Sequence, residues 1–524
     1  MSGWQQHLPI VPVVLPLATA AVLMLIDEQR RAWKQGVAMA SSLLLLLVGA
    51  ALVRAADQWA GQGVPIVYRL GNWPAPFGIV LVADRLSALM VLLAAVLGFA
   101  ALLFAVARWD RAGPRFHALL QVLLMGVNGA FLTGDLFNLF VFFEVFLAAS
   151  YGLALHGSGA ARVQASLHYI VINLTASLLF LVGAALIYGV TGTLNLADLA
   201  VRIPAVAAQN RALLEAGAAV LGIAFLIKAG MWPLCFWLPR AYGAACAPAA
   251  ALFAILTKVG IYAVLRIWLL FFGPAAGASA GFGQDWLTIG GLVTLAFGAV
   301  GVLGAQELPR LAGFSLIASC GTLLAAVGAG SAAVSGAALY YLIASTLGVS
   351  ALFLLIELVE RGRAPGADLL AITEEAFGGF EAEEREDVGV VIPAVWAVLG
   401  LAFVACVLML AGLPPLPGFV AKAALLSALL APDAVAPSAW VLLALLMLSG
   451  LATVVAASRT GVRIFWMPEQ QLAARVRVIE MLPIVLLLGI GLALTVLAGP
   501  ALRYLDEAAQ ALHAPAGYIE GVLR

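Results

Sequence analysis

The chain is a succession of apolar stretches, each long enough to cross a lipid bilayer. A spanning helix needs about 20 mostly apolar residues. Charged residues make up only 10% of the chain, whereas a soluble domain carries about 25%, and no globular core could hide so much apolar surface. The sequence therefore predicts an all-α, multi-pass membrane protein with about 14 spans. They lie near residues 8–26, 36–54, 78–107, 114–133, 135–156, 164–190, 210–233, 246–271, 286–304, 309–330, 334–358, 388–430, 438–458 and 479–500.

Basic residues predict how the spans are oriented. The first apolar stretch is followed by Arg30, Arg31 and Lys34 and has no basic segment before it. This order is typical of a first spanning helix and not of a cleaved signal peptide. With fourteen spans, sixteen Lys and Arg residues fall on the cytoplasmic side and eight on the other. Positive charge favours the inside, so both termini are expected outside.

Several function classes are excluded by composition and motifs. The net charge is zero, and there is no basic stripe that would bind nucleic acid. No P-loop, Rossmann fingerprint or nucleophile triad occurs, so the chain is not expected to be an enzyme or to need a cofactor. The cysteines stand singly in or beside apolar segments and form no CxxC, so no metal site is expected. These cysteines are Cys235, Cys246, Cys320 and Cys406.

The lysines are the most informative residues of the sequence. The chain has four lysines and 23 arginines. Three of the lysines, Lys228, Lys258 and Lys422, lie inside apolar spans, where a charge costs about 2.5–3.5 kcal/mol on insertion scales. Buried lysine can give up its proton, whereas arginine does not. The pattern therefore predicts groups that accept and release protons. The other interpretation, that each lysine pairs with a carboxylate to pin helices, leaves two without partners.

One carboxylate is predicted at membrane depth. Glu144 lies nine residues beyond Asp135, which is about 13 Å along a helix, whereas Asp135 is expected at the mouth of the span. Glu144 has no polar neighbour in its own segment. Its partner must come from another helix, and Lys228 is the predicted one.

Two of the predicted spans are broken by proline. Lys228 lies five residues before Pro233, and Lys422 lies five residues after Pro417. Proline removes a backbone donor, and irregular backbone at membrane depth survives only where it lines a cavity or is buried in protein. Two breaks with nearby lysines predict a transporter built from two inverted repeats, with helices 7 and 12 broken. The prolines at the breaks are Pro233, Pro414, Pro415 and Pro417.

Relay groups between Lys258 and Lys422 are predicted from hydroxyls in the spans between them. Hydroxyls in membrane helices also bond their own backbone, and a histidine near the end of a span is also expected at the membrane interface. For these residues both the relay and the structural interpretation stay open. The polar segment 361–387 is expected to be a cytoplasmic linker or a docking site. The candidate relay residues are Ser315, Ser319, Thr322, Ser345, Thr346, Ser350 and His168.

Four segments carry a resemblance to a known family. They are Phe142-Phe143-Glu144; Lys228-Ala229-Gly230-Met231-Trp232-Pro233 with Phe236-Trp237-Leu238-Pro239; Ala247-Pro248 and Thr257-Lys258-Val259-Gly260-Ile261-Tyr262; and Gly412-Leu413-Pro414-Pro415-Leu416-Pro417-Gly418-Phe419 with Lys422. In them the chain resembles the antiporter-like membrane subunits shared by Mrp antiporters, respiratory complex I and membrane-bound hydrogenases. The resemblance extends over nearly the whole chain.

Within that family, four further segments look like those of the D-type Mrp subunits: 134–144, 149–153, 458–466 and 518–520. The resemblance implies a subunit of a multisubunit Na⁺ or K⁺/H⁺ antiporter in the bacterial inner membrane, with partners of the A, B, C, E, F and G types. Protons would move through half channels formed by Glu144, Lys228, Lys258 and Lys422. No cluster of membrane carboxylates is present, so this subunit alone is not expected to bind Na⁺. The implied division is 1–110 (helices 1–3), 111–275 (first antiporter repeat), 276–465 (second repeat) and 466–524 (helix 14 and a short outer segment).

The sequence departs from the family pattern in one place. Many relatives carry a histidine, and often a lysine, on the eleventh helix, where this chain has Ala344 and Val349. Neither can carry a proton, so the central relay must use hydroxyls and water. Two other functions remain open: a proton-pumping subunit of a complex I or hydrogenase type redox complex, and a scaffold that transports nothing. The placement of the lysines argues against the scaffold.

Overall fold

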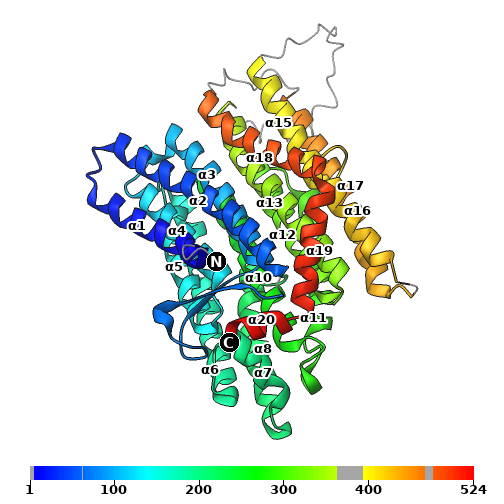
Figure 1. Cartoon of the computed structure of the whole chain (residues 1–524). Coiled ribbons are helices and arrows are strands. Elements are labelled where there is room, and N and C mark those ends of the chain that lie inside the picture. The colour runs from blue at the N-terminus through cyan, green and yellow to red at the C-terminus, as the bar shows by residue number, and fades with distance from the viewer. Residues whose placement is uncertain (1–4, 62, 363–393, 433, 466–475) are drawn as a thin grey trace.

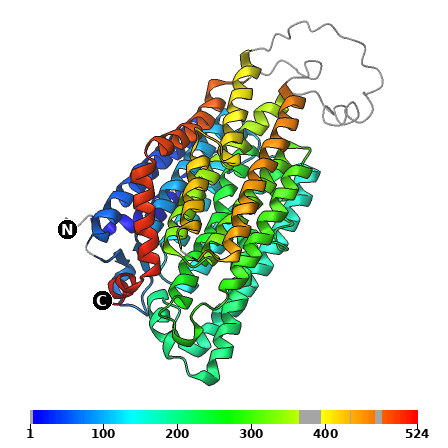
Figure 2. The ribbon, with the colours of Figure 1, turned by 90° about the vertical axis from the view of Figure 1, so that its right-hand side faces the viewer.

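The protein is a bundle of long apolar helices. The computed structural model describes residues 5–61, 63–362, 394–432, 434–465 and 476–524. Within these ranges, 13 helices are long and apolar enough to cross a membrane. They run side by side in one body, as Figure 1 and the turned view in Figure 2 show.

The secondary structure is almost entirely helical. The elements of the first half are η1 (Gln5–Ile10), α1 (Val11–Leu25), α2 (Arg31–Ala60), β1 (Ile66–Arg69), η2 (Leu70–Asn72), β2 (Val80–Ala83), α3 (Arg85–Ala107), η3 (Trp109–Arg111), α4 (Phe116–Leu132), α5 (Leu136–Ala154), α6 (Ala160–Thr191), α7 (Leu196–Arg202), η4 (Ile203–Ala205), α8 (Ala208–Ala229), α9 (Leu238–Ala244) and α10 (Ala247–Phe272). Those of the second half are η5 (Gly277–Ser279), α11 (Gln284–Gly304), α12 (Leu308–Gly328), α13 (Ala332–Arg361), α15 (Ala394–Ala411), α16 (Pro417–Leu430), α17 (Pro437–Phe465), α18 (Val478–Val496), α19 (Ala498–His513) and α20 (Ala516–Leu523).

The predicted fold class is confirmed. The predicted seventh span is α8 followed by a turn and the short α9, and the predicted twelfth is the pair α15 and α16. The predicted span near 114–133 forms α4, an apolar helix of only 17 residues that falls short of the length of the other 13. The orientation in the membrane and the division of the chain into repeats stay predictions. The predicted linker lies largely outside the described residues.

Small residues let the helices approach closely. An added Cβ at Gly291 of α11 would lie 2.3 Å from the backbone nitrogen of Ala325, and one at Gly321 of α12 would lie 2.3 Å from that of Leu295. Because lipid is as apolar as a leucine side chain, membrane helices associate through such close backbone contact. The α11–α12 pair therefore tolerates no side chain at either glycine.

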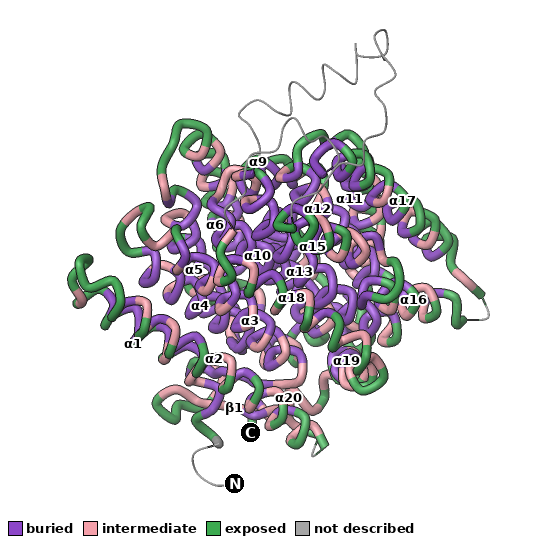
Figure 3. Tube along the Cα trace, turned by 90° about the horizontal axis from the view of Figure 1, so that it is seen from above, coloured by how far each residue is buried: buried purple, intermediate pink, exposed green. Residues whose placement is uncertain are grey.

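Three helices form the centre of the bundle. Helices α10, α12 and α13 are buried along nearly their whole length, and Figure 3 shows α10 and α13 in purple at the middle of the tube. All three carry residues that the sequence predicts to handle protons, so that these residues lie away from lipid.

A small hairpin, which the sequence did not predict, stands at one end of the bundle. Strands β1 and β2 pair antiparallel, with Ile66 opposite Ala83 and Arg69 opposite Val80. Each strand has only four residues, which is too short for an alternating pattern to be recognised. Helix η1 and helix α20 pack on the hairpin. We call this end, formed by η1, β1, β2 and α20, the terminal face.

The opposite end is tied together by polar contacts around η3. Trp109 Nε1 donates to Oε2 of Glu357 at the end of α13 (2.6 Å), and Arg361 pairs with Glu480 at the start of α18 (2.8 Å). His156 Nε2 lies 2.8 Å from the carbonyl oxygen of Trp109. We call this end the loop face.

Candidate functional site

Glu144 and Lys228 meet through a hydroxyl. Ser177 of α6 donates a short hydrogen bond to Oε1 of Glu144 on α5, and Lys228 Nζ on α8 donates to the Ser177 oxygen at 3.4 Å. Among the ion pairs of the described residues, none joins Glu144 to Lys228 directly. The predicted pair is thus bridged by a third helix. Because a serine hydroxyl both donates and accepts, it can pass a proton between the two.

Lys228 is enclosed and, among the described residues, makes no direct ion pair. Its side chain is 4% exposed, and its ammonium lies 5.0 Å from the ring centroid of Phe143. A cation over an aromatic face is attracted to the ring quadrupole, which partly replaces lost water. The residue is therefore stabilised as a cation without being locked into a salt bridge.

The break after Lys228 is a turn that satisfies its own backbone. Helix α8 ends at Gly230 in the left-handed conformation (φ 73°). The amide of Met231 donates to the carbonyl of Leu226, and the amide of Trp232 donates to Oγ1 of Thr294 on α11 at 2.9 Å. Backbone groups at this depth have no water to bond. The partners on α8 and α11 therefore stabilise the break near Pro233.

Helices α8 and α10 touch where the first two lysines stand. An added Cβ at Gly260 would lie 2.9 Å from the carbonyl carbon of Lys228 and 2.6 Å from the nitrogen of Ala229. Lys258 is two residues from Gly260 on α10. The glycine thus brings the backbones that carry Lys228 and Lys258 into contact.

Lys258 begins a chain of hydroxyls. It is fully buried, with 0% exposure, and its ammonium donates to Oγ of Ser319 on α12 at 2.8 Å. Ser319 in turn donates to Oγ of Ser345 on α13 at 2.9 Å, and Ser345 donates to the Leu342 carbonyl at 3.2 Å. Two predicted relay residues are therefore joined to a predicted lysine across three helices.

The other predicted relay residues are placed less favourably. Thr322 and Thr346 bond their own helix four residues back, and Ser350 donates to the Ala251 carbonyl. His168 is exposed, and its Nδ1 lies 3.0 Å from the carbonyl of Gln164 on its own helix. Thr346, Ser350 and His168 thus have no described hydrogen bond to the Lys258 chain, whereas Thr322 and Ser319 both bond the side chain of Tyr341.

Lys422 is held by backbone groups of the described helices. Its ammonium, 6% exposed, donates to the carbonyl of Ala411 at the end of α15 (2.7 Å) and to that of Leu446 on α17 (3.5 Å). The carbonyl end of a helix carries partial negative charge, so the broken α15 supplies a counter-charge without a carboxylate. None of the described hydrogen bonds links Lys422 to Ser345. Ala344 and Val349, on the same helix as Ser345, are buried and apolar.

Buried polar atoms without partners mark a region that the sequence did not single out. Within the described ranges, the hydroxyls of Tyr151, Tyr242 and Ser315 and the Nε1 of Trp237 have no hydrogen-bond partner. The rings of Tyr151 and Trp237 each lie 5.3 Å from that of Tyr169, and Tyr242 lies 5.8 Å from Trp237. Such orphaned groups usually bond ordered water. The three aromatic residues, beside the break in helix 7, therefore present polar atoms that no described protein group bonds.

Two basic residues that the charge count assigned to the two sides of the membrane are buried within helices. Arg266, one of the eight basic residues that the charge count places on the outer side, lies within α10 and is 7% exposed. Lys34, which the count assigned to a cytoplasmic loop, lies within α2, is buried and pairs with Glu28 at 2.7 Å. The loop placement of Lys34 was wrong, because Glu28 compensates its buried charge inside the helix, and Asp84 does the same for Arg266. The side of the membrane on which each residue lies stays a prediction. Asp135 stands at the mouth of α5, where its Oδ1 caps the helix by accepting from the amide of Asn138.

Metal chemistry has no visible support in the part of the chain that the structure describes. Within those residues, no group of three or more His, Cys, Asp or Glu side chains is arranged to hold a metal ion. The chemistry that the arrangement offers is proton exchange among amines, hydroxyls and one carboxylate.

Comparison with known families gives one clear match. The family described as NADH:quinone oxidoreductase/Mrp antiporter, TM matches residues 133–453. This range includes Glu144, both helix breaks and the three lysines of the site.

Individual relatives match over the whole length. A protein of Rhizobium meliloti (strain 1021), named as the D subunit of a probable K(+)/H(+) antiporter, is 56% identical over 532 residues, covering 100% of this chain and 98% of that protein. The D subunit of a Na(+)/H(+) antiporter of Alkalihalophilus pseudofirmus is 35% identical over 527 residues, covering 99% of each. Among solved structures, a chain of the Mrp complex from Dietzia sp. DQ12-45-1b superimposes with a TM-score of 0.84 and 27% identity, and the match covers 100% of both chains.

Proposed function

The chain belongs to the family of membrane subunits found in NADH:quinone oxidoreductases and Mrp antiporters, and from that premise we propose that it is the D-type, proton-translocating subunit of a multisubunit monovalent cation/proton antiporter. The exchanged cation is Na⁺ or K⁺, and the partners are subunits of the A, B, C, E, F and G types. In the proposed orientation the terminal face is outside and the loop face is in the cytoplasm.

One observation carries the proposal: three amines are buried among apolar helices and bonded to neutral groups. Lys228 and Lys258 contact serine hydroxyls, and Lys422 contacts carbonyls. A lysine that served only to pin helices would be expected to face a carboxylate, since a buried unpaired charge is costly. Amines held by neutral partners can lose and regain a proton without breaking an ion pair.

In the proposed path, Lys228 and Glu144 exchange protons through Ser177. A proton on the Lys228 ammonium moves to the Ser177 oxygen while the Ser177 proton moves to Glu144, so that the hydroxyl is unchanged at the end. Water among Tyr151, Tyr242 and Trp237 supplies the exchange with the loop face. A proton on Lys258 moves to the Ser319 oxygen while the Ser319 proton moves to Ser345 and the Ser345 proton leaves to water, so that both hydroxyls are restored. Lys422 serves the second half of the chain. Water must bridge the apolar stretch around Ala344 and Val349, since neither residue exchanges protons.

The alternative is a proton-pumping subunit of a redox complex, because the matching family includes NADH:quinone oxidoreductases. Full-length relatives that are named as D subunits of antiporters favour the antiporter. A redox-driven pump would acidify vesicles when an electron donor is added and would not respond to a cation pulse.

The test is antiport by the whole complex in everted vesicles from cells that lack other antiporters. A ΔpH set by respiration should be dissipated on adding Na⁺ or K⁺, with Li⁺ as a third cation, and Lys228→Ala should abolish this response. Lys34→Ala is the matched control, because Lys34 pairs with an exposed carboxylate, and it should retain activity. If the natural complex ignores all three cations, the antiporter proposal is wrong. If Lys228→Ala assembles and keeps full activity, the chain acts as a scaffold.

A further inference from the structure

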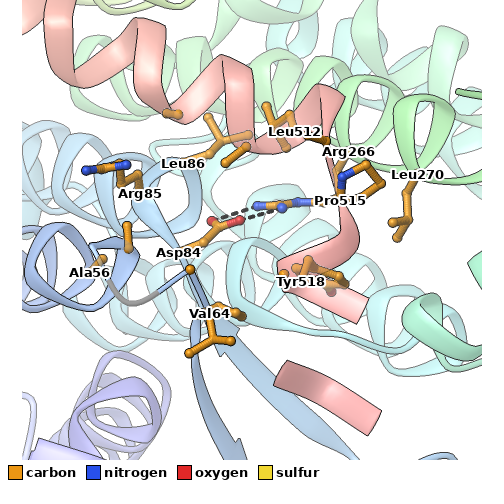
Figure 4. A pocket seen from close by; sticks show the side chains of 17 residues that line it. Ala56, Val64, Asp84, Arg85, Leu86, Arg266, Leu270, Leu512, Pro515 and Tyr518 are labelled. Carbon is orange, nitrogen blue, oxygen red and sulfur yellow. Dashed lines mark hydrogen bonds and ion pairs between the residues drawn. The ribbon is translucent and has the colours of Figure 1, made fainter. Parts of the chain in front are cut away.

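A second buried charge lies on the same helix as Lys258. Arg266 Nη1 and Nη2 donate to Oδ2 and Oδ1 of Asp84 at 2.5 and 2.8 Å, a bidentate pair drawn in Figure 4. Its guanidinium carbon also lies 5.5 Å from the ring of Tyr262 and 5.4 Å from that of Tyr518 on α20. One guanidinium is thus held by α3, α10 and α20 together.

Lys258, Tyr262 and Arg266 follow one another along one face of α10. Residues four apart on a helix lie one above the other, so each step covers about 6 Å and the whole row about 12 Å. The Tyr262 hydroxyl accepts from Arg266 Nη2 at 3.4 Å and donates to the Phe131 carbonyl at 2.6 Å. The row is buried throughout. It leads from the most enclosed lysine toward the terminal face.

A cavity opens at the far end of this row. It has a volume of about 260 Å³ and is walled by the end of α2, the segment 63–65 before the hairpin, the start of α3, and helices α10, α19 and α20. Of the residues that line the cavity, Arg266 and Leu270 come from α10. Arg266 is the one closer to Lys258 along this helix. The space is large enough for several waters, since one water occupies about 30 Å³.

The Asp84 carboxylate is kept charged beside this cavity. Burial by itself would raise the pKa of Asp84, but the charge of Arg266 and the hydrogen bonds from Arg266 and Ser87 hold that pKa below its ordinary value. The pair is therefore a fixed dipole at neutral pH, with its positive end on α10.

We propose that the Arg266–Asp84 pair is a plug that separates the cavity at the terminal face from Lys258. Arginine keeps its proton, so it repels hydrogen ions and cations in the cavity and cannot relay them. Asp84 and the two tyrosine rings stabilise that charge in place. The inference rests on the proposed proton path through Lys258. A plug gives a reason why Arg266, a charge that exchanges no proton, is buried on the same helix as Lys258.

A simpler role is a clamp that docks α20, because Tyr518 stacks on the same guanidinium. The two roles depend on different properties of arginine. A plug needs the positive charge, whereas a clamp needs the planar fork that bonds Asp84 twice. Arg266→Lys keeps the charge and loses the fork, and Arg266→Gln loses both.

The experiment measures passive proton leak through the purified whole complex in vesicles, with a ΔpH imposed and no Na⁺ or K⁺ gradient. Arg266→Gln should raise the leak about tenfold, since a unit charge a few ångström from a path changes the energy of a passing proton by at least that factor. Arg266→Lys should stay near the natural rate. The double variant Asp84→Asn/Arg266→Gln leaves no unpaired carboxylate and should also leak.

The matched control is Arg85→Gln. Arg85 lines the same cavity but pairs with the half-exposed Asp57 and Glu507 and lies on α3, away from the row. It should not leak. Equal leak from Arg266→Lys and Arg266→Gln, or a double variant that assembles and stays tight, would overturn the plug. The leak is read without a driving cation, so it reports on the plug even if antiport itself is absent.

Discussion

Lys228 and Lys422 stand at two similar helix breaks and are held by different kinds of partner. Both breaks follow a glycine with positive φ, Gly230 (73°) and Gly412 (78°). Lys228 donates to a hydroxyl that is bonded to a carboxylate, whereas Lys422 donates to two backbone carbonyls. A hydroxyl can pass a proton on, and a carbonyl can only accept a hydrogen bond. The described partner at the first break can therefore pass on the proton of its lysine, whereas the carbonyls at the second break only orient Lys422, so that a proton leaving Lys422 needs water.

The largest effect is expected from replacing Glu144, the acid that is linked to Lys228 at the first break. Glu144→Gln keeps the size of the side chain and its hydrogen bond to Ser177 but cannot take up a proton. Antiport should fall about 100-fold, the scale of lost acid–base groups, with the complex still assembled. Asp135→Asn, one helix end away, is the control and should change activity little. A fully active Glu144→Gln would place the exchange site elsewhere.

The next largest effect is expected at Ser177, whose hydroxyl lies between the Glu144 carboxylate and the Lys228 ammonium. Ser177→Ala should lower antiport about tenfold, because a water that replaces the hydroxyl bridges less well than a fixed group. Thr175→Ala is matched to it on the same helix: its hydroxyl bonds the Val171 carbonyl and is exposed. Initial rates in vesicles compare the two, and equal rates would mean that Glu144 reaches Lys228 without Ser177.

A smaller effect separates the two breaks. An added Cβ at Gly412 would lie 2.5 Å from Cδ of Lys422, whereas one at Gly230 would meet Leu238 at 3.0 Å. Both alanine variants force a residue into the left-handed region at a cost of about 1–2 kcal/mol. Gly412→Ala should also lower the turnover of each assembled complex a few-fold, because it displaces the lysine. Gly230→Ala should lower the amount of complex but not its turnover, and the reverse pattern would contradict this account.

The smallest expected effect is a pH dependence of stability at the loop face, just after the end of α5. Burial lowers the pKa of His156 below its ordinary value. As the pH falls, the unfolded form therefore gains its proton at a higher pH than the folded form does. The contact of His156 with Trp109 has its full stability above about pH 6.5, the ordinary pKa of histidine. Its stability falls as the pH drops from there to the lowered native pKa, because only the unfolded form gains a proton in that window. Hydrogen exchange of residues 108–116 from pH 8 to 5 should rise, and His156→Gln should flatten the profile. Helix α15, which has no histidine, is the internal reference.

The three lysines of the site could be read from the sequence because their cost is local. An amine within an apolar run of 20 residues is buried in any packing of that run, and the structure leaves them 0–6% exposed. The helix breaks were predictable for the same reason, since proline acts on its own backbone. Arg266 lies inside the predicted span 246–271, six residues from the end of α10, but its burial could not be read in the same way, because an arginine near the end of a span can also reach the interface.

The sequence by itself determined the fold class, the breaks and the depth of the amines, because apolar length and proline act on the segment that contains them. Only the tertiary structure decided which groups those amines meet. Ser177 and Ser319 come from other helices than Lys228 and Lys258, and a single hydroxyl on an apolar helix looks the same in the sequence whether it faces lipid, its own backbone or a lysine. The side of a helix that faces inward is set by packing between segments distant along the chain.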